Sequence, residues 1–175
     1  MIKFSEQHLQ IIRTHAENIY PEECCGIILG YLANEGKTTV EVMPTENVWN
    51  TEASAEFSGD VSRQAGSLLC ERLRQREASP TRLRTPESKK RQYTIAPQVM
   101  LQAQKQARDR SLNIIGIFHS HPDHPAIPSE CDRLYAWQGY SYIIVSVQNG
   151  KATELRSWSL DDTHQFQAET IENII

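Results

Sequence analysis

The sequence predicts a single α/β domain built on a mixed β-sheet, and three observations support this prediction. The 175 residues suffice for one domain with its own core, and the hydrophobic fraction of 39% is ordinary for a globular protein. Segments with helical and with strand periodicity alternate along the chain. Two pairs of strand-like segments are joined by short turns, and such hairpins exclude a purely parallel sheet. Residues 1–175 are therefore expected to form one domain without internal repeats.

The N-terminal part of the chain is expected to form a helix and a β-hairpin. Apolar side chains recur at helical spacing over residues 5–19, with Ser5 as the candidate N-cap and Pro21 as the stop. Residues 24–32, CCGIILGYL, form an apolar run typical of a buried strand. Residues 38–48 alternate between apolar and polar, so we expect them to pair antiparallel with that strand across the turn ANEGK.

The C-terminal part is expected to contain two short helices and a second hairpin. The first helix begins near Pro97, since proline is favoured in a first helical turn. The turn QNGK joins the two strands of the hairpin. In chain order, the expected elements are a helix over 97–110, a strand over 112–121, a helix from Ser129, strands over 140–147 and 152–160, and a final edge strand within FQAETIENI.

A basic segment interrupts this pattern at about residues 51–92, where few large apolar side chains occur and only 60–76 fits a helix. Between Arg72 and Arg91 the chain carries eight Lys or Arg residues and two Glu, a net charge of +6. We expect a mobile surface insert whose charges are solvated. The alternative is that residues 72–91 dock an acidic partner.

Composition excludes several classes of protein. The formal net charge of -4 gives no indication of nucleic-acid binding. The N-terminus lacks a signal-peptide pattern and the longest apolar stretch is too short for a bilayer, so a cytoplasmic location without membrane contact is expected. The four cysteines include no C-x-x-C pair, which disfavours an all-cysteine zinc site.

Residues 116–132, GIFHSHPDHPAIPSECD, contain a candidate metal site. His119 and His121 alternate on the expected strand, so both imidazoles face one side and could reach one cation. Asp132 would lie in the first turn of a helix that begins at Ser129. Two histidines and one carboxylate, with a fourth position open, are typical of a catalytic zinc site.

Another interpretation competes for Asp132. Ser129 and Asp132 also have the spacing of a capping box, in which the carboxylate would bend back to the Ser129 amide. His124, in a proline-flanked loop, is expected at the rim of the site rather than among the ligands.

Metal-assisted hydrolysis also needs a group that takes a proton from water. Glu22 and Glu23 precede the first expected strand, immediately after Pro21, and either carboxylate could be brought beside the metal. Spacing alone does not choose between them.

These motifs resemble those of the JAMM (MPN-plus) metalloproteases. The sequence HSHPDHPAIPSECD fits the family pattern of His-Ser/Thr-His, seven residues, and Ser-x-x-Asp. The family also has a glutamate three residues before a glycine at its first strand, which matches Glu23 and Gly26 in EECCGIILG. The resemblance covers residues 1–50 and 93–160 in outline, while the insert at 51–92 has no counterpart.

The resemblance implies an MPN fold, a curved mixed sheet sandwiched by helices and related to cytidine deaminases. It implies one zinc ion per chain, held by His119, His121 and Asp132, with Glu23 as general acid/base and Ser129 stabilising the oxyanion. Ser120 would be structural. The short stand-alone form is similar to the bacterial branch, which implies a peptidase or isopeptidase acting at the C-terminus of ubiquitin-like or sulfur-carrier proteins.

Two alternatives remain open at the level of the sequence. One is a non-catalytic MPN scaffold that only binds partners, although such scaffolds usually lack a ligand and this chain has all of them. The other is a zinc protein of the same fold linked to DNA repair, whose motif tends to carry Asn where this chain has Ser120. Base deamination is disfavoured because the sequence lacks the P-C-x-x-C motif that accompanies H-x-E in the deaminase pattern.

Overall fold

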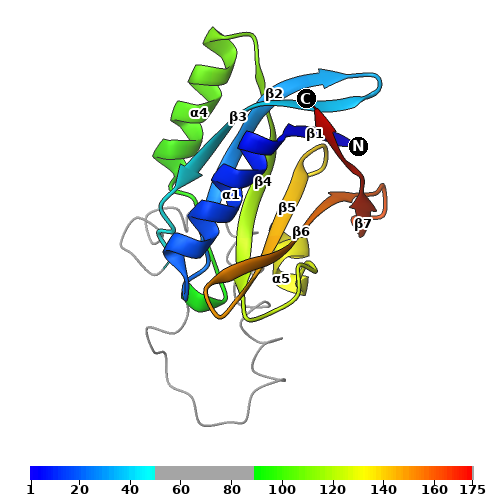
Figure 1. Cartoon of the computed structure of the whole chain (residues 1–175). Helices are drawn as coiled ribbons and strands as arrows, with labels where there is room; N and C mark the ends of the chain where they lie inside the picture. The colour runs from blue at the N-terminus through cyan, green and yellow to red at the C-terminus, as the bar shows by residue number, and fades with distance from the viewer. Residues whose placement is uncertain (50–88, 175) are drawn as a thin grey trace.

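A computed structural model of the chain describes residues 1–49 and 89–174. In these two ranges the backbone forms one eight-stranded sheet with helices packed against it (Figure 1). The elements in chain order are β1 (Ile2–Ser5), α1 (Glu6–Ile19), β2 (Cys25–Ala33), β3 (Gly36–Thr45), α4 (Pro97–Asp109), β4 (Asn113–Pro122), α5 (Glu130–Tyr135), β5 (Ser141–Gln148), β6 (Lys151–Leu160), β7 (Phe166–Glu169) and β8 (Ile171–Ile174).

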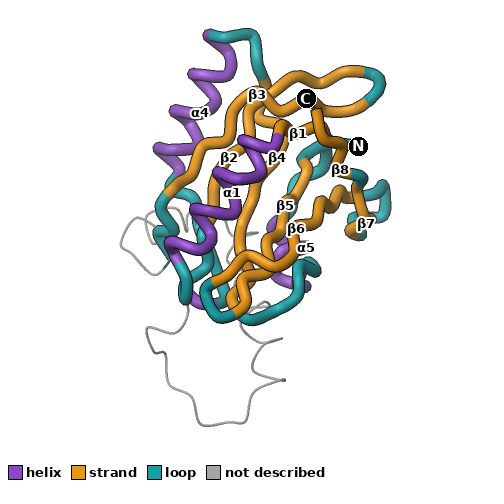
Figure 2. The backbone as a smooth tube through the Cα atoms, in the orientation of Figure 1, coloured by secondary structure: helices purple, strands orange, loops and turns teal. Residues whose placement is uncertain are grey.

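The sheet is mixed and curves until it nearly closes. Its strand order is β7-β6-β5-β4-β2-β3-β1-β8. Strands β7 and β8 lie at opposite ends of this order, yet only Thr170 separates them in the chain. The two edges of the sheet therefore approach each other at this residue (Figure 2). The pairs β1–β3, β1–β8 and β4–β5 are parallel, and the other pairs are antiparallel.

Most of the expected elements are present. Ser5 caps α1, since its hydroxyl accepts a hydrogen bond from the backbone N–H of His8 at 3.3 Å. Both hairpins form with the expected antiparallel pairing. The C-terminal tail differs, because it forms two short strands instead of one edge strand. Strand β7 pairs with β6, whereas β8 pairs with β1. The change of pairing partner occurs at Thr170, whose carbonyl accepts from the N–H of Ile2.

The expected insert lies mostly outside the described residues. The expected helix at 60–76 and most of the basic segment belong to residues 50–88, which the structure does not describe. Only residues 89–92 of the segment are described. The carbonyl of Lys89 accepts from the backbone N–H of Glu23, and the carbonyl of Gln92 accepts from the side-chain amide of Asn47. The solvated insert and the alternative that residues 72–91 dock an acidic partner both remain predictions.

Helices cover both faces of the sheet, and each face has its own apolar core. On one face α1 buries Leu9, Ile12 and Ala16 against strand residues such as Ile28 and Phe118. On the other face α4 buries Ala103 and Ala107. The strand neighbours Ile27 and Ile117 belong to this second core, as the alternation of side chains along a strand requires.

The parallel pairing of β4 and β5 determines where the polar residues of the motif meet. Parallel neighbours need a crossover connection, and here the crossover is the proline-rich loop 123–129 followed by α5. Ala136, directly after α5, belongs to the core on the α4 side. The crossover therefore returns across that same face, over the carboxyl end of β4. Within the part of the chain that the structure describes, no helix combines the length and apolar character needed to cross a bilayer.

Candidate metal centre

The end of β4 places two histidine side chains on one face of the sheet. His119 is fully buried and His121 is 8% exposed. They share the strand face of Ile117, which packs in the core on the α4 side. Their Nε2 atoms lie 3.0 Å apart. The alternation predicted from the sequence therefore brings both ring nitrogens to one point.

Asp132 reaches the same point from the first turn of α5. Its Oδ1 lies 3.3 Å from Nε2 of His119, and its Oδ2 lies 3.6 Å from Nε2 of His121. One donor atom from each of the three residues lies within 4.8 Å of the others. The crossover thus joins ligand candidates that are separated in the chain by the proline-rich loop.

The three side chains fit a metal ion. Zinc–nitrogen and zinc–oxygen bonds of about 2.0–2.1 Å in a tetrahedral arrangement place the ligand atoms roughly 3.3 Å apart. The observed separations of 3.0, 3.3 and 3.6 Å bracket this spacing. Two imidazoles and one carboxylate are also a donor set that zinc accepts while leaving one position open. This group could therefore hold a metal ion.

Asp132 also takes part in a capping box, so the two interpretations of this residue do not exclude each other. Its Oδ2 accepts a hydrogen bond from the N–H of Ser129 at 2.6 Å, and its own N–H donates to Oγ of Ser129 at 3.1 Å. The carboxylate has two oxygens, so Oδ2 can serve the cap while Oδ1 faces His119. The cap also orients the carboxylate toward the histidines.

The site perturbs the pKa of each of the three groups. Burial lowers the pKa of His119, although the nearby Asp132 carboxylate partly offsets this effect. Burial acts in the same direction on His121, but there the hydrogen bond and charge of Asp132 prevail and raise its pKa. Burial alone would raise the pKa of Asp132, yet the charges and hydrogen bonds of the two histidines hold it well below its usual range.

The two histidine rings are oriented by different contacts. Nδ1 of His121 lies 2.9 Å from the carbonyl oxygen of Pro125, the kind of outer contact that usually orients a metal-binding histidine. Nδ1 of His119 is buried and has no hydrogen-bond partner among residues 1–49 and 89–174. Instead, the His119 ring stacks on Tyr93, with ring centroids 4.5 Å apart and an interplanar angle of 25°. Sequence analysis missed Tyr93, because no spacing relates it to the histidine motif.

Glu23, rather than Glu22, lies on the face of the histidines. Cys25 pairs with His119 in the antiparallel register, and continuing this register places Glu23 opposite His121. Glu23 is 6% exposed, whereas Glu22 is half-buried. The negative charge of Glu23 also contributes to the raised pKa of His121. Of the two acidic residues that the sequence left open, the structure thus brings Glu23 to the site.

Ser120 joins the start of β2 to the end of β4. Its Oγ accepts a hydrogen bond from the backbone N–H of Cys24 at 2.8 Å, and its own N–H donates to the carbonyl of Cys24 at 3.2 Å. Because Cys24 follows Glu23 directly, this pair holds the backbone that carries the glutamate. The contact agrees with the structural role expected for Ser120.

Ser129 and His124 lie at the edges of the site. The hydroxyl of Ser129 accepts from Asp132 N–H, which leaves its own proton unused in that bond. His124 is exposed and, among the described residues, is not one of the converging ligand atoms. Its position agrees with the expected rim.

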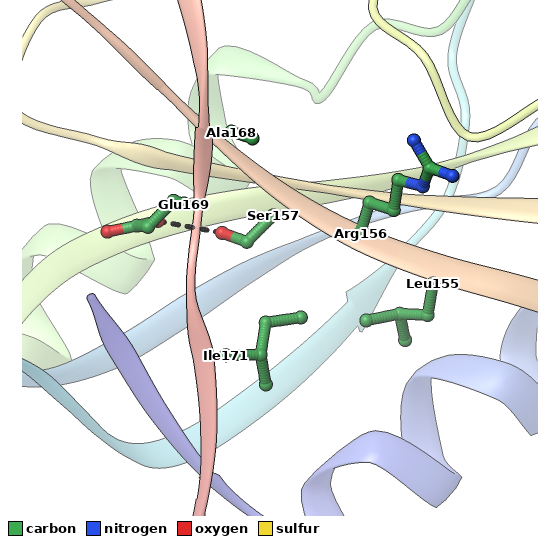
Figure 3. A pocket seen from close by; sticks show the side chains of 6 residues that line it. All are labelled: Leu155, Arg156, Ser157, Ala168, Glu169 and Ile171. Atoms are coloured by element: carbon green, nitrogen blue, oxygen red, sulfur yellow. Dashed lines mark hydrogen bonds between the residues drawn. The ribbon is translucent and has the colours of Figure 1, made fainter.

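A separate surface pocket lies between β6, β7 and the start of β8. It has a volume of about 220 Å³ (Figure 3). Ser157 donates a hydrogen bond of 2.7 Å to Glu169 at its edge. The lining residues are Leu155, Arg156, Ser157, Ala168, Glu169 and Ile171. None of the candidate site residues lines this pocket.

Comparison with known proteins identifies the class to which this fold and site belong. Residues 5–161 match the family described as prokaryotic homologs of the JAB domain. This match spans most of the chain, and the chain belongs to that family. No protein with a curated description matches it.

Solved structures show the same fold. A protein of Desulfitobacterium hafniense matches with a TM-score of 0.68 and 22% identity, covering 99% of this chain and 93% of the other. A protein of Salinibacter ruber matches with a TM-score of 0.60 and 26% identity over 99% and 92% of the two chains. A JAB1/MPN domain protein of Archaeoglobus fulgidus matches with a TM-score of 0.51 and 15% identity over 99% and 98%. The MPN fold expected from the motifs is thus confirmed.

Proposed function

We propose that this chain is a zinc-dependent peptidase or isopeptidase that hydrolyses the bond at the C-terminus of a ubiquitin-like or sulfur-carrier protein. In this proposal His119, His121 and Asp132 hold one zinc ion, Glu23 transfers protons and Ser129 stabilises the oxyanion. The observation that carries the proposal is the convergence of the three ligand candidates on the face that also holds the buried Glu23.

A complete set of site residues favours an enzyme over a scaffold. A protein that only binds partners has no need to bury two histidines and two acidic residues together, because burial of such groups costs free energy unless they are paired. Here His119 and Glu23 are both buried at the end of the β2–β4 pair. We infer that chemistry, rather than packing, accounts for this set.

The residues divide the hydrolysis among themselves. A bound zinc ion supplies Lewis acidity, which makes water easier to deprotonate at neutral pH. Glu23 accepts a proton from water, whose oxygen attacks the carbonyl carbon of the scissile bond. The hydroxyl of Ser129 donates a hydrogen bond to the oxygen that becomes negative. Glu23 then delivers the proton to the leaving amine as the carbon–nitrogen bond breaks.

Burial of the ligands also bears on the substrate. Both histidine rings are nearly or fully buried, so a protein substrate must reach them with a thin segment. The C-terminal Gly-Gly tail of a ubiquitin-like carrier is such a segment, since glycine has no side chain. The proposed partner is therefore a carrier whose folded body stays outside while its tail enters.

The direct test is to incubate the zinc-loaded protein with sulfur carriers of its own organism, each extended at the C-terminus. The extension should be lost after the Gly-Gly pair, as measured by intact mass. Wild-type protein stripped of metal and the His119→Ala variant should both be inactive. Cleavage that persists in both controls would refute zinc-dependent hydrolysis. Tight binding of an unextended carrier without cleavage of any extended one would instead support the scaffold.

A further inference from the structure

One carboxamide, that of Asn47, joins three separate segments next to the candidate metal centre. Asn47 follows β3 and is 6% exposed. Its Nδ2 donates to the carbonyl oxygens of Glu23 at 3.0 Å and Gln92 at 2.9 Å. Its Oδ1 accepts from the backbone N–H groups of Trp49 at 3.0 Å and Thr94 at 3.1 Å. Both donor protons and both acceptor positions of the amide are thus in use.

Two of these segments carry groups that face the metal ligands. One contact is to the backbone of Glu23 itself. Two further contacts, to Gln92 and Thr94, are on either side of Tyr93, whose ring stacks on His119. A single side chain therefore holds the backbone of the proton-transfer candidate and the backbone of the residue that packs against a ligand.

The stack on Tyr93 bears on the orientation of the His119 ring. Histidines that bind metals usually donate their second N–H to an acceptor, and this contact sets the ring orientation. Nδ1 of His119 is buried without such a partner in the part of the chain that the structure describes. The stack on Tyr93 takes the place of that contact. The hydrogen bonds of Asn47 with Gln92 and Thr94, together with the one from Val48 N–H to the Thr94 carbonyl, hold the backbone on both sides of Tyr93.

We propose that Asn47 is a positioning residue that holds Glu23 and Tyr93 in place relative to the metal ligands. The part that concerns Glu23 rests on the proposed function. The part that concerns His119 needs only that the site binds a metal ion. Asn47 contacts neither the ligands nor the reacting atoms in this role, and it acts through the two segments that it joins.

The test compares Asn47→Ala and Asn47→Asp with Ser157→Ala, each loaded with zinc. Asn47→Asp keeps the acceptor atoms but replaces the two donated bonds by repulsion between oxygens. Ser157 is a matched control, because it is similarly buried and its hydrogen bond to Glu169 joins β6 to β7, which are two and three strands from β4. The readouts are the rate of zinc release to a chelator, the visible spectrum of the cobalt-loaded protein, and kcat and KM for an extended carrier.

Both Asn47 variants should release zinc about 10- to 100-fold faster than wild type, the usual effect of losing an outer-shell contact. The cobalt spectrum should shift, and kcat should fall with little change in KM. Ser157→Ala should match wild type in all three readouts. If Asn47→Ala melts at a lower temperature but keeps the wild-type release rate and cobalt spectrum, Asn47 only supports the fold and the proposal is wrong.

A second pair of variants keeps the proposal testable if the Asn47 variants do not fold. Tyr93→Phe retains the ring stack on His119, whereas Tyr93→Leu removes it. Rapid zinc release from the leucine variant alone would support positioning through the stack, and wild-type release from both would overturn it. Zinc release does not depend on any carrier, so failure of the wild type to cleave carriers would count against the proposed function and not against this inference.

Discussion

Oδ1 of Asp132 lies 3.3 Å from Nε2 of His119, while Oδ2 of the same carboxylate accepts a hydrogen bond from the backbone of Ser129. The second contact closes the capping box of α5, and the first brings the helix to the end of β4. Helix capping and assembly of the site therefore depend on one side chain. Substitutions can separate the two contributions, because a metal ligand and a cap have different chemical requirements.

Removal of one histidine should abolish tight metal binding. We expect one zinc ion per chain in the wild-type protein and almost none in His119→Ala, because a three-ligand site cannot spare a ligand. Elemental analysis after native purification measures this. His124→Ala is the matched control, since His124 is exposed and outside the converging group, and it should keep its zinc. Equal zinc in the wild type and His119→Ala would contradict the assignment.

Substitution of Asp132 should remove zinc without unfolding the protein. Asn keeps an oxygen that can accept the Ser129 N–H, but it is a poor zinc ligand. We therefore expect Asp132→Asn to lose zinc while its metal-free stability falls by about 1 kcal/mol or less. Ser129→Ala should show the opposite pattern, with zinc retained and a loss of about 1 kcal/mol from the missing cap. Metal analysis paired with thermal melting of the metal-free proteins would decide.

The two neighbouring glutamates should differ sharply in their effect on turnover. Glu23→Gln should keep zinc and the fold but lower the rate by a factor on the order of 100 or more, as expected for loss of a positioned general base. Glu22→Gln should stay close to wild type, because Glu22 is not on the face of the histidines. Initial rates on an extended carrier measure both variants. An inactive Glu22→Gln would show that the register assigned to the start of β2 is wrong.

Gly26 should tolerate no side chain, because Phe118 packs directly over it. A Cβ at this position would lie 2.1 Å from Cε1 of Phe118 and 2.5 Å from the carbonyl oxygen of Met43. We expect Gly26→Ala to lose about 1–3 kcal/mol or more of stability. Urea unfolding of the metal-free protein measures the loss. Adding Phe118→Leu should recover part of it, and no recovery would mean that the clash with Met43 dominates.

Stability in acid should depend on Asp161, in the turn between β6 and β7. Hydrogen bonds from the N–H of Gln165 and from Thr163 lower the pKa of Asp161 to about 2. A carboxyl group whose pKa is lowered by folding stabilises the fold at pH values above its pKa in the unfolded chain, which is about 3.9. This contribution disappears as the pH falls toward 2. Asp161→Asn keeps an acceptor oxygen but cannot titrate.

Between pH 5 and pH 2.5 the free energy of unfolding should therefore fall more in the wild type than in Asp161→Asn. Denaturant unfolding of the metal-free proteins at the two pH values gives this difference. An equal fall in both proteins would show that the Asp161 carboxyl does not contribute. The same turn contacts the helix that carries Asp132. Nε2 of His164, in this turn, lies 3.0 Å from the carbonyl oxygen of Arg133 in α5.

The sequence predicted much of the fold because local patterns determine it. The cap at Ser5, the apolar run of β2 and the turn signals of the two hairpins depend on residues close in the chain, and all three predictions were confirmed. The tail was not predicted correctly. Its division into β7 and β8 at Thr170 depends on β6 and β1, which lie at distant places in the sequence.

The sequence by itself determined the ligand candidates and their family, because His119, His121 and Asp132 lie in one short motif whose spacing follows from a strand and a helix start. The family motif implied Glu23 rather than Glu22. Only the tertiary structure showed which of the two lies on the face of the histidines, since that depends on the register of β2 against β4. It alone showed that Asp132 both caps α5 and faces the histidines. It also revealed Tyr93 and Asn47, whose contacts join segments far apart in the chain and leave no periodic pattern in the sequence.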